Sequence, residues 1–334
     1  MSFRQDYLSA LLQLTAATAP AAALALFRYQ AQNCLPYQEY LTALGRDLRQ
    51  VESLADIPFL PIEFFKTHAV RTAANEWEPQ ETFLSSGTTQ QQRSHHFVRE
   101  PELYRHHAAR IFERYYGPLT GWTILALLPS YLEQGNSSLV AMVEHFARES
   151  GQRQPAFFLH DHAALVQALG EAKREANRKV LLIGVSYALL DFAAAYAGQP
   201  ELLDLTVLET GGMKGRRREM IREELHQELQ QGFGPAGIHS EYGMTEMLGQ
   251  AYSFGDGRFH APPQLQILLR DPSDPFSVSE SLAAGALNVI DLANIDSCAF
   301  IETKDLARRH PDGSFEVLGR LDNSDVRGCN QMAT

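Results

Sequence analysis

The sequence predicts an α/β fold in which helices cover mostly parallel sheets, followed by a β-rich C-terminal part. From residue 120 onward, short apolar runs such as "WTILALL" and "KVLLIG" alternate with helical patterns such as "SLVAMVEHFARES". Strands that alternate with helices in this way typically form parallel pairs with helices packed on the sheet. After residue 250 the helical patterns stop, and Asp256-Gly257 and Asp312-Gly313 are dipeptides typical of hairpin turns. We therefore expect the last third of the chain to be β-rich.

The elements before residue 120 are expected to be helical at first. Residues 4–50 predict a helical cap, because "AALALFRYQ" places apolar residues on one face and Pro20 suits a first helical turn. The whole is interpreted as one domain over residues 1–320, with a cap (1–50), an α/β part (80–250) and a β-rich part (251–320). Residues 321–334 are expected to form a tail that carries Cys329.

The composition excludes several classes of protein. The 334 residues carry a formal net charge of -11, which lacks the basic excess of a nucleic-acid binder. No apolar run is long enough for a membrane span, and Pro20 interrupts the Ala-rich start, which argues against a signal peptide. The three cysteines, an odd number without CxxC spacing, argue against a disulfide framework and a zinc site. A cytoplasmic protein with small molecules or proteins as partners is expected.

The first candidate site is a run of small residues in "FLSSGTTQQQRSHHFV", directly after an expected strand. Its members are Ser85, Ser86, Gly87, Thr88 and Thr89. Glycine lets backbone N–H groups point into a concavity, and hydroxyls add hydrogen bonds to phosphate oxygens. The run therefore indicates a phosphate cradle, without the GK[ST] ending of a Walker A loop. The alternative is a polar turn that caps the next element.

Two later segments could complete a nucleotide site. In "HSEYGMTEMLGQ", the Thr245 hydroxyl can bond a phosphate, and the Glu246 carboxylate can hold Mg²⁺ together with substrate phosphates. In "FIETKDLARRHPDGSFEVLGRLD", Asp305 could bind a ribose diol. The alternatives are a loop with a satisfied glutamate and an aspartate that caps a turn.

In this order the segments resemble the adenylate-forming superfamily of acyl-CoA synthetases, luciferases and peptide-synthetase adenylation domains. "SSGTT" resembles its phosphate loop, "YGMTE" its Mg²⁺ and phosphate motif, and "TKDLARRHPDGSFEVLGRLD" its ribose-binding aspartate and hinge. "ETGGMKG" resembles its adenine-binding stretch. The resemblance spans residues 80–330 and implies the fold of the superfamily's large N-terminal domain, with ATP and Mg²⁺ as cofactors. It assigns nucleotide binding, beyond the residues above, to Gly211, Gly212, Tyr242, Gly243 and Arg320.

Two departures narrow the resemblance. Gln90, Gln91, Gln92 and Arg93 follow "SSGTT", where the superfamily usually has Gly and Lys. The sequence ends fourteen residues after Arg320, where the superfamily usually continues with a lid domain that carries a catalytic lysine. With "LPIEFFKTH" near its start and "GRLDNSDVRGCN" near its end, the sequence resembles the acyl-protein synthetase (LuxE) family. That resemblance implies ATP-dependent activation of a fatty acid, transfer to a cysteine, and an acyl reductase as partner.

Cys329 is the cysteine that this resemblance selects. Arg327 lies two residues before it and favours a thiolate, the form that attacks acyl groups, and Gly328 gives the tail conformational freedom. The alternative is an inert tail cysteine. Cys34 and Cys298 lie in apolar surroundings and are expected to be buried. The candidates to replace the lid lysine are Lys66, Lys214 and Lys304.

Other functions stay open on the sequence alone. The chain could use CoA as acceptor, like acyl- or aryl-CoA ligases, or take acyl groups from acyl-CoA without ATP. It could also be a non-catalytic nucleotide- or acyl-binding subunit. "LIGVSYA" resembles the nucleophile elbow of α/β-hydrolases through Gly184 and Ser186, with Ala188 where that motif has Gly and with His239 or His260 as base.

Two further expectations concern side-chain placement. In the adenylate-forming interpretation, Val185 and Tyr187 would line the acyl pocket and contact substrate carbon. The adjacent pairs His95-His96 and His106-His107 are expected at the surface, because neighbouring side chains diverge and cannot share a metal.

Overall fold

The computed structural model describes residues 2–86, 92–129, 135–153, 156–175, 177–211, 220–234, 237–279 and 281–321. Contacts divide the chain into two compact units. Unit 1 comprises Met1–Arg99, Glu246–Gly249 and His260–Thr334, and unit 2 comprises Glu100–Thr245 and Gln250–Phe259. The predicted boundary at residue 320 lies where the described residues end, so that division stays a prediction.

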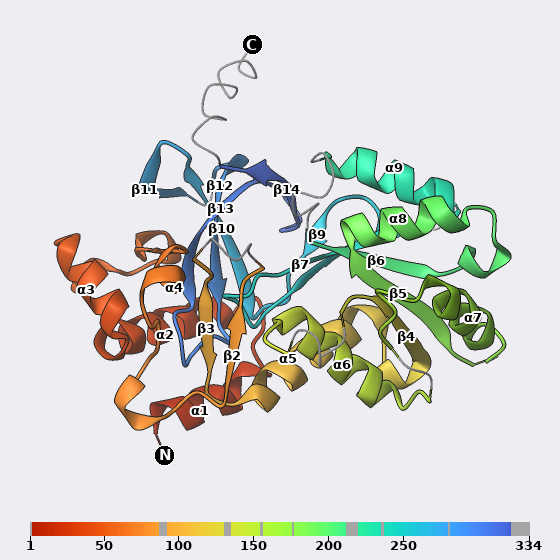
Figure 1. The fold of residues 1–334 in the computed structure, drawn as a ribbon. Helices are drawn as coiled ribbons and strands as arrows, with labels where there is room; N and C mark the ends of the chain where they lie inside the picture. The colour runs from red at the N-terminus through yellow and green to blue at the C-terminus, as the bar shows by residue number, and fades with distance from the viewer. Residues whose placement is uncertain are drawn as a thin grey trace, which may run out of the picture. The chain divides into compact units, whose positions relative to one another are not determined.

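Unit 2 is built on the predicted parallel sheet (Figure 1). Its strands are β4 (Trp122–Leu127), β5 (Lys179–Val185), β6 (Thr206–Thr210) and β7 (Ile238–Tyr242), in this order and all parallel, with β8 (Ala251–Ser253) antiparallel to β7. Nearly every residue of β4 to β7 is buried, as expected for strands covered on both faces. The sequence-based prediction for this part is confirmed.

In the described residues of unit 2, five helices pack beside that sheet. In Figure 1, α8 and α9 lie on one side of it and α5 and α6 on the other. Gly232 allows α9 to approach α8, since a Cβ there would lie 2.9 Å from the Ala193 Cα. The helices are α5 (Pro101–Tyr116), α6 (Ser138–Ser150), α7 (His162–Ala172), α8 (Ser186–Tyr196) and α9 (Arg222–Phe233).

Unit 1 contains the β-rich part. Its antiparallel order is β11 (Asp274–Ser279), β10 (Leu265–Asp271), β12 (Ala284–Asp291), β13 (Phe300–Arg309) and β14 (Phe315–Arg320). β1 (Leu60–Pro61) runs parallel to the first half of β13, and β14 pairs with the second half. Thr303 and Lys304 lie between the part of β13 that pairs with β1 and the part that pairs with β14. The predicted Asp312-Gly313 turn joins β13 to β14, with Gly313 at φ +86°, which favours glycine. β2 (Glu81–Leu84) and β3 (His95–Val98) form a separate hairpin, and β9 (Phe259–His260) is where the chain passes from unit 2 to unit 1.

The N-terminal helices hold the loop between β12 and β13. Pro20 lies in the first turn of its helix, as predicted. The buried Gln30 amide donates to the carbonyl oxygens of Asn294 (2.9 Å) and two neighbours, and its oxygen accepts from the Ala299 N–H (2.9 Å). Arg4 adds an ion pair to Asp296 at 2.6 Å. These helices are α1 (Phe3–Leu11), α2 (Ala19–Asn33), α3 (Leu35–Ala43) and the short α4 (Phe64–Thr67).

Short 3₁₀ turns connect these elements: η1 (Leu48–Gln50), η2 (Leu54–Asp56), η3 (Ala74–Glu76), η4 (Leu119–Gly121) and η5 (Pro200–Leu202). Within the described ranges, no helix combines the length and the apolar character needed to cross a membrane.

Candidate functional site

Glu246 is the central carboxylate of the candidate site in unit 1. Its residue is 6% exposed. The Asn294 amide donates to the Glu246 carbonyl at 2.8 Å, and the Asn294 oxygen pairs with His96 Nε2 at 2.9 Å. Because the N-terminal helices hold the loop that carries Asn294, the backbone of Glu246 is fixed by elements far away in the sequence.

The neighbours of the Glu246 side chain partly offset the effect of burial on its pKa. Burial raises the pKa of Glu246, while a hydrogen bond with Ser94 and the charges of Lys66 and Arg320 act in the opposite direction. A buried carboxylate is costly unless it is paired or bonded. Burial therefore raises the pKa of Glu246 overall, while one hydroxyl and two positive charges favour the charged form, the form that a cation would bind.

The start of the predicted phosphate cradle is joined to Glu246 through Ser94. The Ser94 N–H donates to Ser85 Oγ at 2.9 Å, and the Ser85 N–H donates to the Ser94 carbonyl at 3.1 Å. This pair closes the β2–β3 hairpin. Ser86, the next residue, is exposed. The Gln92 amide, at the other end of the loop, donates to the Lys66 carbonyl at 2.8 Å.

The predicted ribose aspartate pairs with Arg320, one of the two cations whose charges act on Glu246. Asp305 and Arg320 are partners across β13 and β14, with Arg320 Nε 3.7 Å from Asp305 Oδ1. The Asp305 side chain is 13% exposed and that of Arg320 is 70% exposed. Lys304, next to Asp305, forms an ion pair with Glu63. Within unit 1, hydrogen bonds thus link Ser85 to Glu246 through Ser94, and the charge of Arg320 relates Asp305 to Glu246 electrostatically.

In unit 2, the described residues that were assigned to nucleotide binding lie at or shortly after the carboxyl ends of the parallel strands. Gly211 follows β6 with φ +74°, and its carbonyl accepts a 3.0 Å hydrogen bond from Ser186 Oγ. The same hydroxyl lies 3.0 Å from Glu209 Oε2. Burial alone would raise the pKa of Glu209, but His226 and Arg222 hold it below its usual value. Tyr242, at the end of β7, is buried.

Glu241 fills the space under Gly243. A Cβ on Gly243 would lie 2.4 Å from Glu241 Oε1, so a larger residue at this position would force the Glu241 carboxyl to move. Thr210 Oγ1 donates to the other carboxylate oxygen of Glu241. Burial, together with the neighbouring charge of Glu209, raises the pKa of Glu241 to about 7. Sequence reasoning missed both glutamates, although a carboxylate at the end of an otherwise apolar strand was the signal available.

The hydrolase alternative finds no support in the geometry. Ser186 is fully buried, and its hydroxyl donates to Glu209 and to the Gly211 carbonyl. His239 lies near the start of β7 and bonds Tyr116 at 3.1 Å, whereas Ser186 follows the end of β5. In the described part of the chain, no histidine ring forms the hydrogen bond with Ser186 that a general base would need.

The predicted surface placement of the histidine pairs is wrong for two of the four. His96 is 1% exposed and bonds Asn294, and His107 is 3% exposed on α5. One pair lies on a strand and the other on a helix, and each of these elements turns one face toward the core. Neighbouring side chains point in different directions, so one histidine of each pair is buried on that face. The predicted burial of Cys34 and Cys298 is confirmed, and burial raises the pKa of the Cys34 thiol to about 11.

For several residues of the predicted site, the structure shows their burial and position but does not test the role predicted for them. Val185 is 3% exposed at the end of β5, Tyr187 is partly exposed in the first turn of α8, and Thr245 lies in a turn directly before Glu246. The acyl-pocket role of Val185 and Tyr187 stays a prediction. Outside the described residues lie Gly87, Thr88, Thr89, Gly212, Lys214 and Cys329.

The donor set around Glu246 suits Mg²⁺ better than a metal that needs a protein cage. In the ranges that the structure describes, no three His, Cys, Asp or Glu side chains gather in a way that could hold a metal ion. Mg²⁺ is usually bound by one or two carboxylates together with substrate phosphates. A single buried carboxylate next to a hydroxyl and cations that attract phosphate fits that mode.

Comparison with solved structures identifies proteins of similar fold. The chain resembles the ATP-bound structure of MatB from Rhodopseudomonas palustris, with a TM-score of 0.52 and 19% identity over 72% of this chain and 47% of that one. It also resembles the O-succinylbenzoate coenzyme A synthetase MenE from Bacillus subtilis in complex with AMP, with a TM-score of 0.50 and 16% identity over 72% and 49% of the two chains. The fold is that of the N-terminal domain of adenylate-forming enzymes, as predicted, and the chain spans about half the length of these structures. No family model and no curated protein matches the sequence.

Proposed function

We propose that this chain activates a carboxylic acid with ATP, giving an acyl adenylate and pyrophosphate. The observation that carries the proposal is the surroundings of Glu246 in unit 1: its carboxyl forms a hydrogen bond with Ser94, which also bonds Ser85, and the charge of Arg320, the ion-pair partner of Asp305, acts on it. The residues that interact with Glu246 thus come from segments that are distant in the sequence, and they offer the donors and cations that a nucleotide requires. The fold and the order of the motifs support the same conclusion.

Residues of the three sequence segments would each bind a different part of the nucleotide. Backbone donors and hydroxyls of residues 85–89 would hold phosphates, with Thr245, while Asp305 would accept hydrogen bonds from the ribose diol. Glu246 would hold Mg²⁺, which supplies charge stabilisation at the phosphate oxygens when it is bound. Lys66 and Arg320, whose charges already act on Glu246, would attract the same phosphates.

The first reaction is a displacement at the α-phosphorus. A carboxylate oxygen of the substrate forms a bond to that phosphorus, and the bond from phosphorus to the bridging oxygen of pyrophosphate breaks. No proton needs to move, so the protein mainly has to align the two substrates and stabilise negative charge. Preorganised donors and cations are suited to that task.

We further propose that the acyl group passes to Cys329, as in acyl-protein synthetases, with a fatty acid as substrate. The thiolate would attack the acyl carbon, forming a C–S bond while the C–O bond to AMP breaks. Cys34 and Cys298 are buried, and burial raises the pKa of both thiols. Since a thiol must ionise to attack, these two are poor nucleophiles, which favours Cys329. An acyl reductase is the expected acceptor protein.

The decisive experiment is ATP–pyrophosphate exchange with a panel of fatty and aromatic acids, followed by intact-mass analysis. Exchange that depends on an acid supports adenylation, and a hydroxylamine-sensitive acyl mass on the protein supports the thioester. In the Cys329→Ser variant, exchange should persist and the acyl mass should disappear. An acyl mass that survives this substitution contradicts the assignment of Cys329. Acyl-CoA formed on addition of CoA would select a CoA ligase, and MgATP binding without exchange a non-catalytic subunit.

A further inference from the structure

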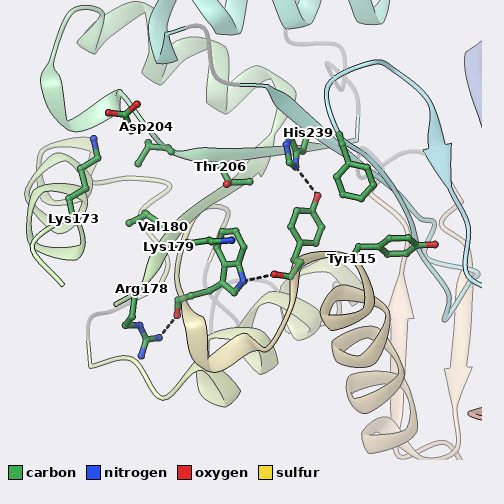
Figure 2. A pocket seen from close by; sticks show the side chains of 12 residues that line it. Tyr115, Lys173, Arg178, Lys179, Val180, Asp204, Thr206 and His239 are labelled. Atoms are coloured by element: carbon green, nitrogen blue, oxygen red, sulfur yellow. Dashed lines mark hydrogen bonds between the residues drawn. The ribbon is translucent and has the colours of Figure 1, made fainter. Parts of the chain in front are cut away.

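A cavity of about 740 Å³ lies at the amino ends of the parallel strands in unit 2 (Figure 2). Trp122, Lys179 and Thr206, the first residues of β4, β5 and β6, line it, as does His239 near the start of β7. Gly211 and Tyr242, two of the residues assigned to nucleotide binding, lie at the opposite ends of β6 and β7. The seven residues of β5 span about 20 Å. Ligands of open α/β sheets usually bind outside the carboxyl ends, so this cavity is a separate place.

One wall of the cavity is aromatic and held in position by hydrogen bonds. The Tyr116 ring centroid lies 5.9 Å from that of Trp122 and 5.5 Å from that of Phe254. Trp122 Nε1 donates to the Tyr116 carbonyl at 3.2 Å, and the Tyr116 hydroxyl pairs with His239 Nδ1 at 3.1 Å (Figure 2). Phe254 is nevertheless 38% exposed. A fixed wall with exposed aromatic surface can stack against a planar apolar ligand.

The charged part of the lining is mainly cationic, and the Lys179 side chain has neither an ion pair nor a hydrogen bond with any described residue. The lining carries Lys173, Arg178 and Lys179 against the single carboxylate of Asp204. Lys173 donates to two backbone carbonyls, one of them Pro200 at 2.9 Å, and Arg178 donates to the carbonyls of Trp122 and a neighbouring turn. Lys179 is exposed, and none of the described carboxylates lies within 4.0 Å of its ammonium group. Its Nζ lies 5.3 Å from the Trp122 ring centroid, at the edge of the aromatic wall.

We propose that this cavity binds a small aromatic carboxylate, with its ring against Tyr116, Trp122 and Phe254 and its carboxylate at Lys179. The volume lies in the range of small-molecule sites, which combine apolar walls with a few polar groups that fix orientation. A carboxylate would give Lys179 the charged partner that it lacks, beside a surface that excludes water. The site requires neither ATP nor Cys329 and goes beyond the proposed activation reaction.

Isothermal calorimetry on the full chain tests this with 2-naphthoate and its neutral analogue 2-naphthalenemethanol. We expect saturable binding of naphthoate, and binding of the alcohol weaker by about tenfold or more, because a hydrogen bond to a charged group is lost. The Lys179→Gln variant should lower naphthoate affinity to that of the alcohol. Phe254→Ala should weaken both ligands.

The control is Arg258→Gln, which removes one exposed positive charge of unit 2 outside the cavity. It should bind naphthoate as the parent does, and thermal unfolding should show that all variants are folded. The proposal is overturned if naphthoate does not bind, if the alcohol binds equally well, or if Lys179→Gln keeps the parent affinity. The last outcome would place naphthoate elsewhere, for example at the site proposed for acid activation.

Discussion

Two buried glutamates, Glu241 and Glu246, lie five residues apart in the same motif but in different surroundings. Burial raises the pKa of both. Glu246 has a hydroxyl and two cations that act against this shift, whereas Glu241 has one hydroxyl and a second glutamate that adds to it. The neighbours of Glu246 thus favour its charged form, in line with the metal role proposed for it, whereas Glu209 beside Glu241 disfavours the charged form.

The largest expected effect is on the activity of Glu246→Gln. The amide keeps the shape and loses the charge, so we expect ATP–pyrophosphate exchange to fall by about 100-fold or more, the cost typical of removing one group that stabilises the transition state. The measurement is kcat/KM for exchange. The control Glu78→Gln changes a carboxylate whose side chain is 91% exposed in the same unit and should retain parent activity. Parent-like exchange in Glu246→Gln would remove this glutamate from the proposed mechanism.

The second effect is on the pH dependence of stability through Glu241. Its folded pKa of about 7 lies above the ordinary value of 4.5. The unfolded chain therefore loses this proton at lower pH than the folded chain, and stability falls as pH rises from about 4.5 to about 7, by about 3 kcal/mol in all. In Glu241→Gln this decline should be absent. Urea unfolding at pH 4, 6 and 8 measures it, and equal pH slopes in the two proteins would show that Glu241 is ionised in the folded state.

The third effect is steric and concerns Gly243→Ala. The added Cβ would meet Glu241 Oε1 at 2.4 Å, and moving this carboxyl would break its hydrogen bond with Thr210. We expect a loss of about 2 kcal/mol in the free energy of unfolding. The matched control is Gly121→Ala, where a Cβ meets nothing within 4 Å.

A double-mutant cycle sharpens this prediction. In a Glu241→Ala background the clash is gone, so Gly243→Ala should cost much less than it does in the parent. Additive effects of the two substitutions would mean that Gly243 is required for a reason other than the Glu241 carboxyl.

The smallest effect is expected for Arg320→Gln. The side chain is 70% exposed and its ion pair with Asp305 spans 3.7 Å, so the free energy of unfolding should change by less than about 0.5 kcal/mol. The KM for ATP should rise severalfold if the charge acts on phosphates. Thermal unfolding and exchange kinetics measure the two quantities. A large loss of stability would assign Arg320 to the fold rather than to the ligand.

Local patterns predicted much of the fold. The apolar runs that became β4 and β5, and the Asp312-Gly313 turn between β13 and β14, depend on residues close together in the sequence. The supports of the site were not predictable in this way. Asn294 forms hydrogen bonds with Glu246, 48 residues away in the sequence, and with His96, 198 residues away. No local sequence pattern could predict either contact. The same reason explains why His96 was expected at the surface.

The sequence by itself determined which segments form strands and helices and which short motifs carry hydroxyls, glycines and carboxylates, because periodicity and turn chemistry are local properties. Only the tertiary structure decided the surroundings of each carboxylate. It gave Glu246 a hydrogen bond with Ser94 and the nearby charges of Lys66 and Arg320. It brought the charge of Glu209 near Glu241 and the Trp122 ring near Lys179. Burial and charge act through distance in space, and distances between remote segments exist only once the chain has folded.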